Sequence, residues 1–261
     1  MRLLAWEFSR GWRGLLGWIA GLAASILLNL PFYPSIGGTE LPELVLRFLP
    51  EQFVKLAGID RIGTGAGFVQ ASHFEMTGFL LAAIAAVSWG SQLLAGREED
   101  GSLELVLARG VSRHRVLLEA AATLALQLAL LNVAGSLLIL LLNGPSELNL
   151  DPSRLAAVTF ALFLLSLVVG LTALAAGAVT GRRGPATAWA TIVAVGAYAL
   201  NALGLVADLP VVAAWSPLHW AFEGDPLFSG FSWAGPLKLL AAGAVLLGVA
   251  LWRFSVRDVN G

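Results

Sequence analysis

The charged stretch at residues 97–118, REEDGSLELVLARGVSRHRVLL, decides how this chain is organised. It is the longest charged interruption between two long apolar segments, and it begins acidic and ends basic. Leu103, Val106 and Leu107 recur at spacings of three and four residues, which predicts one apolar face of a short helix. Ser112 is placed to cap the helix that follows. We therefore expect a short amphipathic helix between two membrane spans, able to dock on a soluble partner. A merely solvated charged loop is the open alternative.

The composition indicates that the solvent around the protein is lipid. The chain has 261 residues, of which 57% are hydrophobic and 13% charged, and its mean hydropathy is +0.80. A soluble domain carries about 25% charged residues. We therefore expect a multi-pass protein of the cell (plasma) membrane. The net charge of -1 gives no indication of a nucleic-acid partner, and the absence of cysteine excludes disulfides, thiolate metal sites and cysteine nucleophiles.

Apolar runs with few charges predict six membrane spans, because about 20 apolar residues cross a bilayer. The expected spans cover residues 14–33, 75–96, 116–143, 153–180, 185–207 and 231–252. The expected segments around them are an interfacial helix at 1–13, an outer loop at 34–74, the cytoplasmic segment at 97–115 and an outer loop at 208–230. Asp151 followed by Pro152 predicts the start of the fourth span. Whether the loop at 208–230 re-enters the membrane stays open.

Three smaller features refine this layout. Residues 1–13 alternate arginine with leucine and tryptophan, which suits a helix in the membrane interface, with a frayed basic tail as the alternative. The run that follows lacks a small-residue cleavage site, so we expect a retained first span rather than a signal peptide. The first outer loop repeats Leu-Pro-Glu, which predicts two short helices within residues 40–70. Gly170, Ala173 and Gly177 in the fourth span suit close helix packing.

Loop charge predicts the orientation of the spans. With six spans both termini lie on one side, and that side collects 11 of the 16 lysines and arginines. They are Arg2, Arg10, Arg13, Arg97, Arg109, Arg113, Arg115, Arg182, Arg183, Arg253 and Arg257. The other side has Arg47, Lys55, Arg61, Arg154 and Lys238. Because positive loops stay inside the cell, both termini and the segment at 97–115 are expected in the cytoplasm.

Residues 98–117, EEDGSLELVLARGVSRHRVL, resemble the signature of ABC-2-type exporter permeases. In that family this region commonly reads as acidic residues, Gly, Ser or Thr, Leu-Glu, aliphatic residues, a small turn, and Val-Ser-Arg before the third span. The six-span layout, the N-terminal helix and the large first outer loop are loosely similar over the whole chain. Gly110 departs from the pattern, since many members have proline there.

The resemblance implies the permease subunit of an ATP-driven exporter. Its substrate would be apolar or amphipathic, such as a drug, an antibiotic or a lipid-like molecule, as in multidrug or antibiotic efflux. A separate cytosolic ABC ATPase would carry ATP and Mg²⁺, because this chain has no G-x-x-x-x-G-K-[ST] sequence and no cofactor of its own is expected. The expected partners are that ATPase, a second permease copy or a homologue, and membrane lipids.

The resemblance also assigns roles to residues. Those expected to couple to the ATPase are Glu98, Glu99, Gly101, Ser102, Leu103, Glu104, Val106, Leu107 and Arg113. In the family, spans 2 and 5 mostly line a substrate path between two permease subunits. Candidate path residues, chosen because they are polar within spans, are Ser88, Gln92, Gln127, Asn132, Tyr198 and Asn201. Hydrogen bonds between helices are the competing interpretation of these side chains.

Two other classes of protein remain as alternatives. An integral membrane enzyme needs a catalytic pair at one depth, and no Ser–His or Asp–Asp pair occurs within the spans. An ion-coupled secondary transporter usually has charged residues in mid-span, and these spans are nearly free of them. His73, His114 and His219 lie far apart without metal-binding spacing, so neither a metal site nor a catalytic residue is expected.

Overall fold

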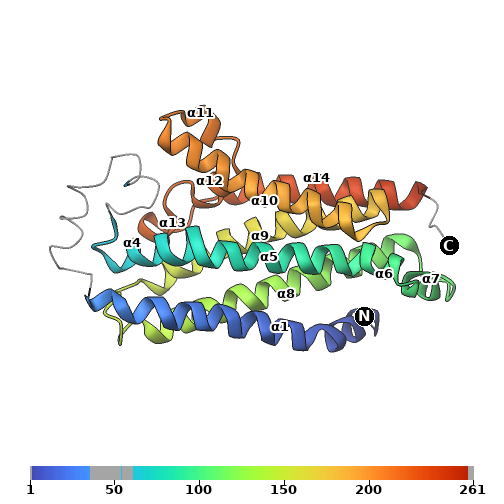
Figure 1. The fold of residues 1–261 in the computed structure, drawn as a ribbon, viewed down its shortest axis with the longest axis horizontal. Helices are drawn as coiled ribbons and strands as arrows, with labels where there is room; N and C mark the ends of the chain where they lie inside the picture. Colours follow the sequence, from blue (N-terminus) through green and yellow to red (C-terminus); the bar gives the residue numbers. More distant parts are fainter. Residues whose placement is uncertain (1, 36–53, 55–60, 258–261) are drawn as a thin grey trace.

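The computed structural model describes residues 2–35, 54 and 61–257, and the regular structure in this part is helical (Figure 1). Six stretches there are long and apolar enough to cross a membrane. They are Trp12–Ser35, Gly65–Glu99, Arg113–Leu142, Pro152–Thr180, Arg183–Val206 and Ala234–Val256. The expected all-α fold with six candidate membrane spans is thereby confirmed for the described residues.

The first helix extends across the boundary predicted at residue 13. Helix α1 (Arg2–Asn29) continues into the 3₁₀ turn η1 (Leu30–Ser35). Its backbone passes residue 13 without a break, so the structure has one helix where the sequence predicts an interfacial helix over 1–13 and a span over 14–33. Arginine is a good helix former, so the charges at residues 10 and 13 do not end the helix.

The helical structure that leads into the second span begins before the predicted start of that span at residue 75. Its consecutive elements are α4 (Gly65–Val69), η3 (Gln70–Thr77), α5 (Gly78–Ser91), η4 (Gln92–Gly96) and α6 (Arg97–Glu99). The sequence places residues up to 74 in an outer loop, because glycines and polar residues there lower helix propensity. Local bonds compensate for this: the Thr64 hydroxyl accepts from the Gly67 amide at 3.1 Å, and η3 has π-helical geometry. The short helices predicted within residues 40–70 fall mostly outside the described residues.

The later helices follow the predicted spans closely. They are α7 (Ser102–Leu107), α8 (Arg113–Leu142), α9 (Pro152–Thr180), α10 (Arg183–Val206) and α14 (Ala234–Val256). Three short helices, α11 (Pro210–Ala213), α12 (Pro217–Phe222) and α13 (Pro226–Ser229), occupy the segment predicted as the second outer loop. Helix α14 continues to Val256, past the predicted boundary at residue 252, and Arg253 lies within its final turn, where a cation suits the helix dipole.

Two predicted helix starts are confirmed by their caps. The Asp151 carboxylate accepts from the Ser153 amide at 2.7 Å, and Pro152 is the first residue of α9. Hydrogen bonds from Ser153 also lower the pKa of Asp151. The Ser112 hydroxyl accepts from the Arg115 amide at 3.4 Å at the start of α8. Both caps satisfy amide groups that the first turn of a helix leaves without partners.

Helix α9 is the centre of the bundle. It packs against α5, α8, α10 and α14, and 72% of its most apolar stretch is buried, against 17–39% for α8, α10 and α14. A methyl group on Gly90 of α5 would overlap the Gly170 carbonyl oxygen and lie 2.9 Å from the Ala173 Cβ. A methyl group on Gly177 would lie 3.1 Å from the Ala95 Cβ. The close packing predicted for the small residues of this span is therefore confirmed.

The two ends of the bundle carry different elements. The beginning of α1, the helices α6 and α7 and the end of α14 lie at one end, and α4, α11 and α13 lie at the other (Figure 1). We call these the α7 end and the α13 end. The arrangement agrees with six spans that alternate in direction, because the beginning of α1 and the end of α14 then lie at the same end.

The α5–α9 contact gives a stability prediction. Gly90→Ala should lower the free energy of unfolding by about 1–3 kcal/mol, the usual cost of overpacking, because its methyl group has no room against α9. Gly196→Ala on α10 is the matched control, since a Cβ there meets no atom within 4 Å. Thermal unfolding of the purified protein in detergent measures both. Equal melting temperatures for the two variants would contradict the packing.

Candidate functional site

The segment between the second and third spans folds into a compact unit at the α7 end. Asp100 and Gly101 form the turn between α6 and α7: the Asp100 carboxylate accepts from the Ser102 amide at 2.9 Å, and Gly101 has a φ of 72°. Leu103 is fully buried, whereas Leu105 is 69% exposed. Helix α7 is therefore anchored by one leucine and presents its opposite face to the surroundings.

The predicted apolar face of α7 is only partly buried. Val106 and Leu107 are half-buried against the core, and Glu104 is exposed. The following turn contains Gly110 with a φ of 78°. Proline fixes φ near -65°, so this turn has a geometry that a proline at residue 110 could not adopt. Glycine at residue 110, where many ABC-2-type permeases have proline, therefore suits the backbone geometry of this turn.

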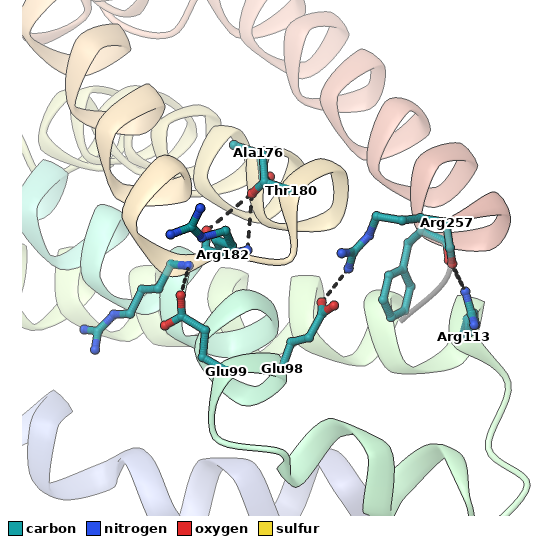
Figure 2. A network of polar contacts seen from close by, with 9 residues as sticks. Glu98, Glu99, Arg113, Ala176, Thr180, Arg182 and Arg257 are labelled. Carbon is teal, nitrogen blue, oxygen red and sulfur yellow. Dashed lines mark hydrogen bonds and ion pairs between the residues drawn. The ribbon is translucent and has the colours of Figure 1, made fainter. Parts of the chain in front are cut away.

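Glu98 forms a buried ion pair with the last helix. Its Oε2 accepts from Arg257 Nη2 at 2.5 Å, and the two side chains are 5% and 14% exposed (Figure 2). Arg113, at the start of α8, donates from Nη1 to the carbonyl oxygens of Phe254 and Arg257, where α14 ends. The terminal carbonyls of a helix lack partners within it and carry negative partial charge, so an arginine suits them. The end of α14 is therefore bound to both α6 and α8.

Glu99 caps a different helix. Its Oε1 accepts from the backbone amide of Arg183 at 2.8 Å, in the first turn of α10 (Figure 2). The N-cap residue of α10, Arg182, supplies no side-chain cap of its own. A carboxylate at a helix N-terminus is favoured by the helix dipole. Glu99 thus provides from α6 the cap that α10 lacks.

We call Glu98, Glu99, Arg113, Arg183 and Arg257 the α6 network. It joins the ends of α8, α10 and α14 to α6, which continues the second span. The turn after α9 also borders it, because a methyl group on Gly181 would overlap the Arg257 guanidinium and lie 2.7 Å from Glu98 Oε1. Five of the six candidate spans therefore meet at these charges.

Three of the residues expected to couple to an ATPase, Glu98, Glu99 and Arg113, make polar contacts within the chain. Glu104, at the surface of α7, remains available for contact. Arg257 and the backbone of Arg183 were not anticipated as their partners. The predicted topology gave one indication of the pairing with Arg257, because it places Arg257 on the same side of the membrane as the acidic residues of α6.

A groove runs between α5 and α10. One compartment, of about 500 Å³, is lined by apolar side chains of both helices together with Thr187 and Thr191. A second compartment, of about 450 Å³, lies toward the α13 end and includes Glu75 and Asn201. Both compartments are lined in part by Met76 and Tyr198, so they adjoin one another. A separate groove of about 430 Å³ lies between α8 and α9.

The predicted path residues are divided among these places. Tyr198 and Asn201 line the groove between α5 and α10, and Asn132 lines the one between α8 and α9, where its amide also donates to the Leu128 carbonyl at 2.8 Å. Gln127 is buried in α8 away from the described grooves. Ser88 is half-buried on α5, and Gln92 is exposed on η4. The structure therefore brings together only two of the six. Residues of the groove that sequence reasoning did not select include Ser72, Met76, Thr187 and Thr191.

The histidines lie on separate elements. His73 is buried in η3, His114 is exposed at the start of α8, and His219 is half-buried in α12. Among the described residues, no three His, Cys, Asp or Glu side chains gather as metal ligands would.

Comparison of the chain with protein-family models finds no match, and a search among curated proteins finds no relative. The resemblance to ABC-2-type permeases therefore stays a prediction that rests on residues 98–117 and on the order of the spans.

The α6 network gives a second stability prediction. Glu98→Ala should lower the free energy of unfolding by about 3–5 kcal/mol, because it leaves the Arg257 guanidinium without its carboxylate in a buried place. Glu104→Ala removes the same group from an exposed position and should leave stability unchanged. Thermal unfolding in detergent compares the two variants with the unmodified protein. A Glu98→Ala protein as stable as the Glu104→Ala protein would show that the ion pair does not hold the helix ends together.

Proposed function

We propose that this chain is the permease subunit of an ATP-driven exporter, which moves an apolar or amphipathic substrate out of the cytoplasm. The observation that carries the proposal is the position of α7. Its outer face is exposed, with Glu104 and Leu105 on the surface, and Leu103 on its inner face is buried. The preceding helix α6 is bound to the first turn of α10 and to the end of α14. A surface helix that is attached in this way to the spans is well placed to transmit the motion of a soluble partner to them.

The α6 network supplies a route for that force. Helix α6 is continuous with α5 through η4, and Glu99 connects α6 to the first turn of α10. These two helices, α5 and α10, line the larger groove. A displacement of α7 toward the membrane would therefore act on both walls of the groove at once. Through Glu98 and Arg257 it would also act on α14.

The same arrangement suggests how the subunit would assemble. The chain has no phosphate-binding loop for ATP, so ATP and Mg²⁺ belong to a separate cytosolic ABC ATPase beneath α7. The outer faces of α1, α10 and α14 are apolar and exposed, as a lipid-facing or subunit-facing surface requires. A second permease copy or a homologue would complete the transporter in the cell membrane, with the groove as part of the substrate path.

Co-purification tests the proposal. The tagged chain, extracted from its native membrane in mild detergent, should bring with it a stoichiometric ATPase that mass spectrometry identifies by its Walker motifs. The double variant Glu104→Arg/Leu105→Ala should lose most of that ATPase, because it alters the exposed face of α7 without touching the α6 network.

The matched control is Glu147→Arg/Val211→Ala, which makes the same kinds of change at exposed positions of the α13 end. It should retain the ATPase. Recovery of the unmodified chain without any nucleotide-binding protein would contradict the exporter proposal. Equal loss of the ATPase from both double variants would contradict the assignment of α7 as the docking helix.

A further inference from the structure

Two arginines at the start of α10 have free guanidinium groups. Arg182 and Arg183 make their hydrogen bonds through backbone atoms, to Thr180 and to Glu99 respectively (Figure 2). Both residues are exposed, and neither guanidinium group has a hydrogen bond or an ion pair with the described part of the chain. The Glu99 carboxylate beside the Arg183 amide offsets one of the two positive charges, so one remains in excess.

The apolar compartment between α5 and α10 begins one helical turn beyond these arginines. Thr187 and Thr191 line it, and Arg183 lies on the same face of α10, because residues four apart on a helix are neighbours. Side chains of a helix incline toward its N-terminus, which directs the Arg183 side chain toward the α7 end. None of the described residues that line this compartment of about 500 Å³ is charged. An uncharged groove therefore has free positive charge at its α7 end.

The compartment is about as long as one leaflet of a bilayer is deep. Thr187 and Tyr198 line its two ends on α10, and the helix rises about 16 Å between them. The hydrocarbon core of a bilayer is about 30 Å thick, so each leaflet contributes about 15 Å. Arg183 lies one turn before Thr187, about 6 Å farther out, which is the depth of the polar head groups. The groove and the arginines therefore match the acyl chain and the head group of one lipid.

We propose that this groove binds an anionic phospholipid from the leaflet at the α7 end, with an acyl chain along α5 and α10 and its phosphate on Arg182 and Arg183. Guanidinium groups bind phosphate oxygens through paired hydrogen bonds, which suits them to this head group. Phosphatidylcholine also has a phosphate, but its choline cation cancels the charge, so an anionic lipid is favoured. The inference goes beyond the proposed function and does not depend on it, since it concerns a bound lipid and not the exported substrate.

Photolabelling of the full chain in phosphatidylcholine nanodiscs tests this inference without an ATPase. Two probes, a phosphatidylglycerol and a phosphatidylcholine, have the same diazirine on one acyl chain. The phosphatidylglycerol probe should label the groove peptides around Ile84 and Thr191 roughly fivefold more than the phosphatidylcholine probe, since one net charge near the membrane surface contributes about that factor. This preference should shrink at about 1 M salt, because the charges of the exposed arginines are then screened.

Three double variants make the result specific. Arg182→Gln/Arg183→Gln should abolish the preference, while it keeps the backbone amide that Glu99 caps. Arg182→Lys/Arg183→Lys keeps both charges and should retain most of the preference. Arg13→Gln/Arg109→Gln is the matched control, since it removes two exposed arginines from other elements, and it should leave the preference unchanged. If the first variant does not fold, the comparison of the two head groups on the unmodified chain, at low and high salt, carries the test.

The outcomes decide the lipid site separately from the exporter proposal. Preferential labelling by the phosphatidylglycerol probe that is lost in Arg182→Gln/Arg183→Gln supports the site, whether or not an ATPase co-purifies. Equal labelling of the groove by both probes, or a preference that this variant keeps, overturns it. Labelling of the groove by neither probe overturns it as well. Glycerol phosphate, which lacks acyl chains, should not compete with the probe, and competition by it would overturn the role of the groove.

Discussion

The fold depends at one end on two adjacent carboxylates that bind helix ends. Glu98 pairs with Arg257 where α14 ends, and Glu99 accepts from the first turn of α10. These are different interactions: one is a buried ion pair, and the other is a cap supplied from a neighbouring helix. A charge that is removed from water is costly unless it is paired and hydrogen-bonded, so the buried Glu98 depends on Arg257, whereas the exposed Glu99 acts as a helix cap. The ends of the spans are thereby set relative to α6.

These contacts connect the exposed helix α7 to the two helices that line the groove. The exposed helix α7 follows α6 after a two-residue turn at Asp100 and Gly101, and α6 continues the helix that forms one wall of the groove. The other wall, α10, begins at the amide that Glu99 caps. A signal at α7 thus has a short path through hydrogen bonds and continuous backbone to both walls. The proposed coupling to an ATPase and the proposed substrate groove are two consequences of one arrangement.

Much of this fold follows from local sequence features. Six spans are predictable because a bilayer requires long apolar helices, and the starts of α8 and α9 follow from Ser112 and Asp151, whose side chains cap within three residues. The helical structure before residue 75 was not predictable, since its polar residues bond to one another across the five-residue spacing of π-helical geometry. The pairing of Glu98 with Arg257 depends on contacts 159 positions apart, which no local pattern specifies. For the same reason, the sequence does not show which polar span residues share a groove: Tyr198 and Asn201 line the one between α5 and α10, and Asn132 lines another.

The account requires that α7 face the cytoplasm, and cysteine labelling tests that requirement most directly, because the chain contains no cysteine of its own. Leu105→Cys would place a thiol on the exposed face of α7, and Ser229→Cys would place one at the α13 end. A membrane-impermeant maleimide added to intact cells should label the second variant at once and the first only after the membrane is permeabilised. Labelling of Leu105→Cys in intact cells would put α7 outside the cell, where no ATP-driven partner could reach it, and would contradict the account.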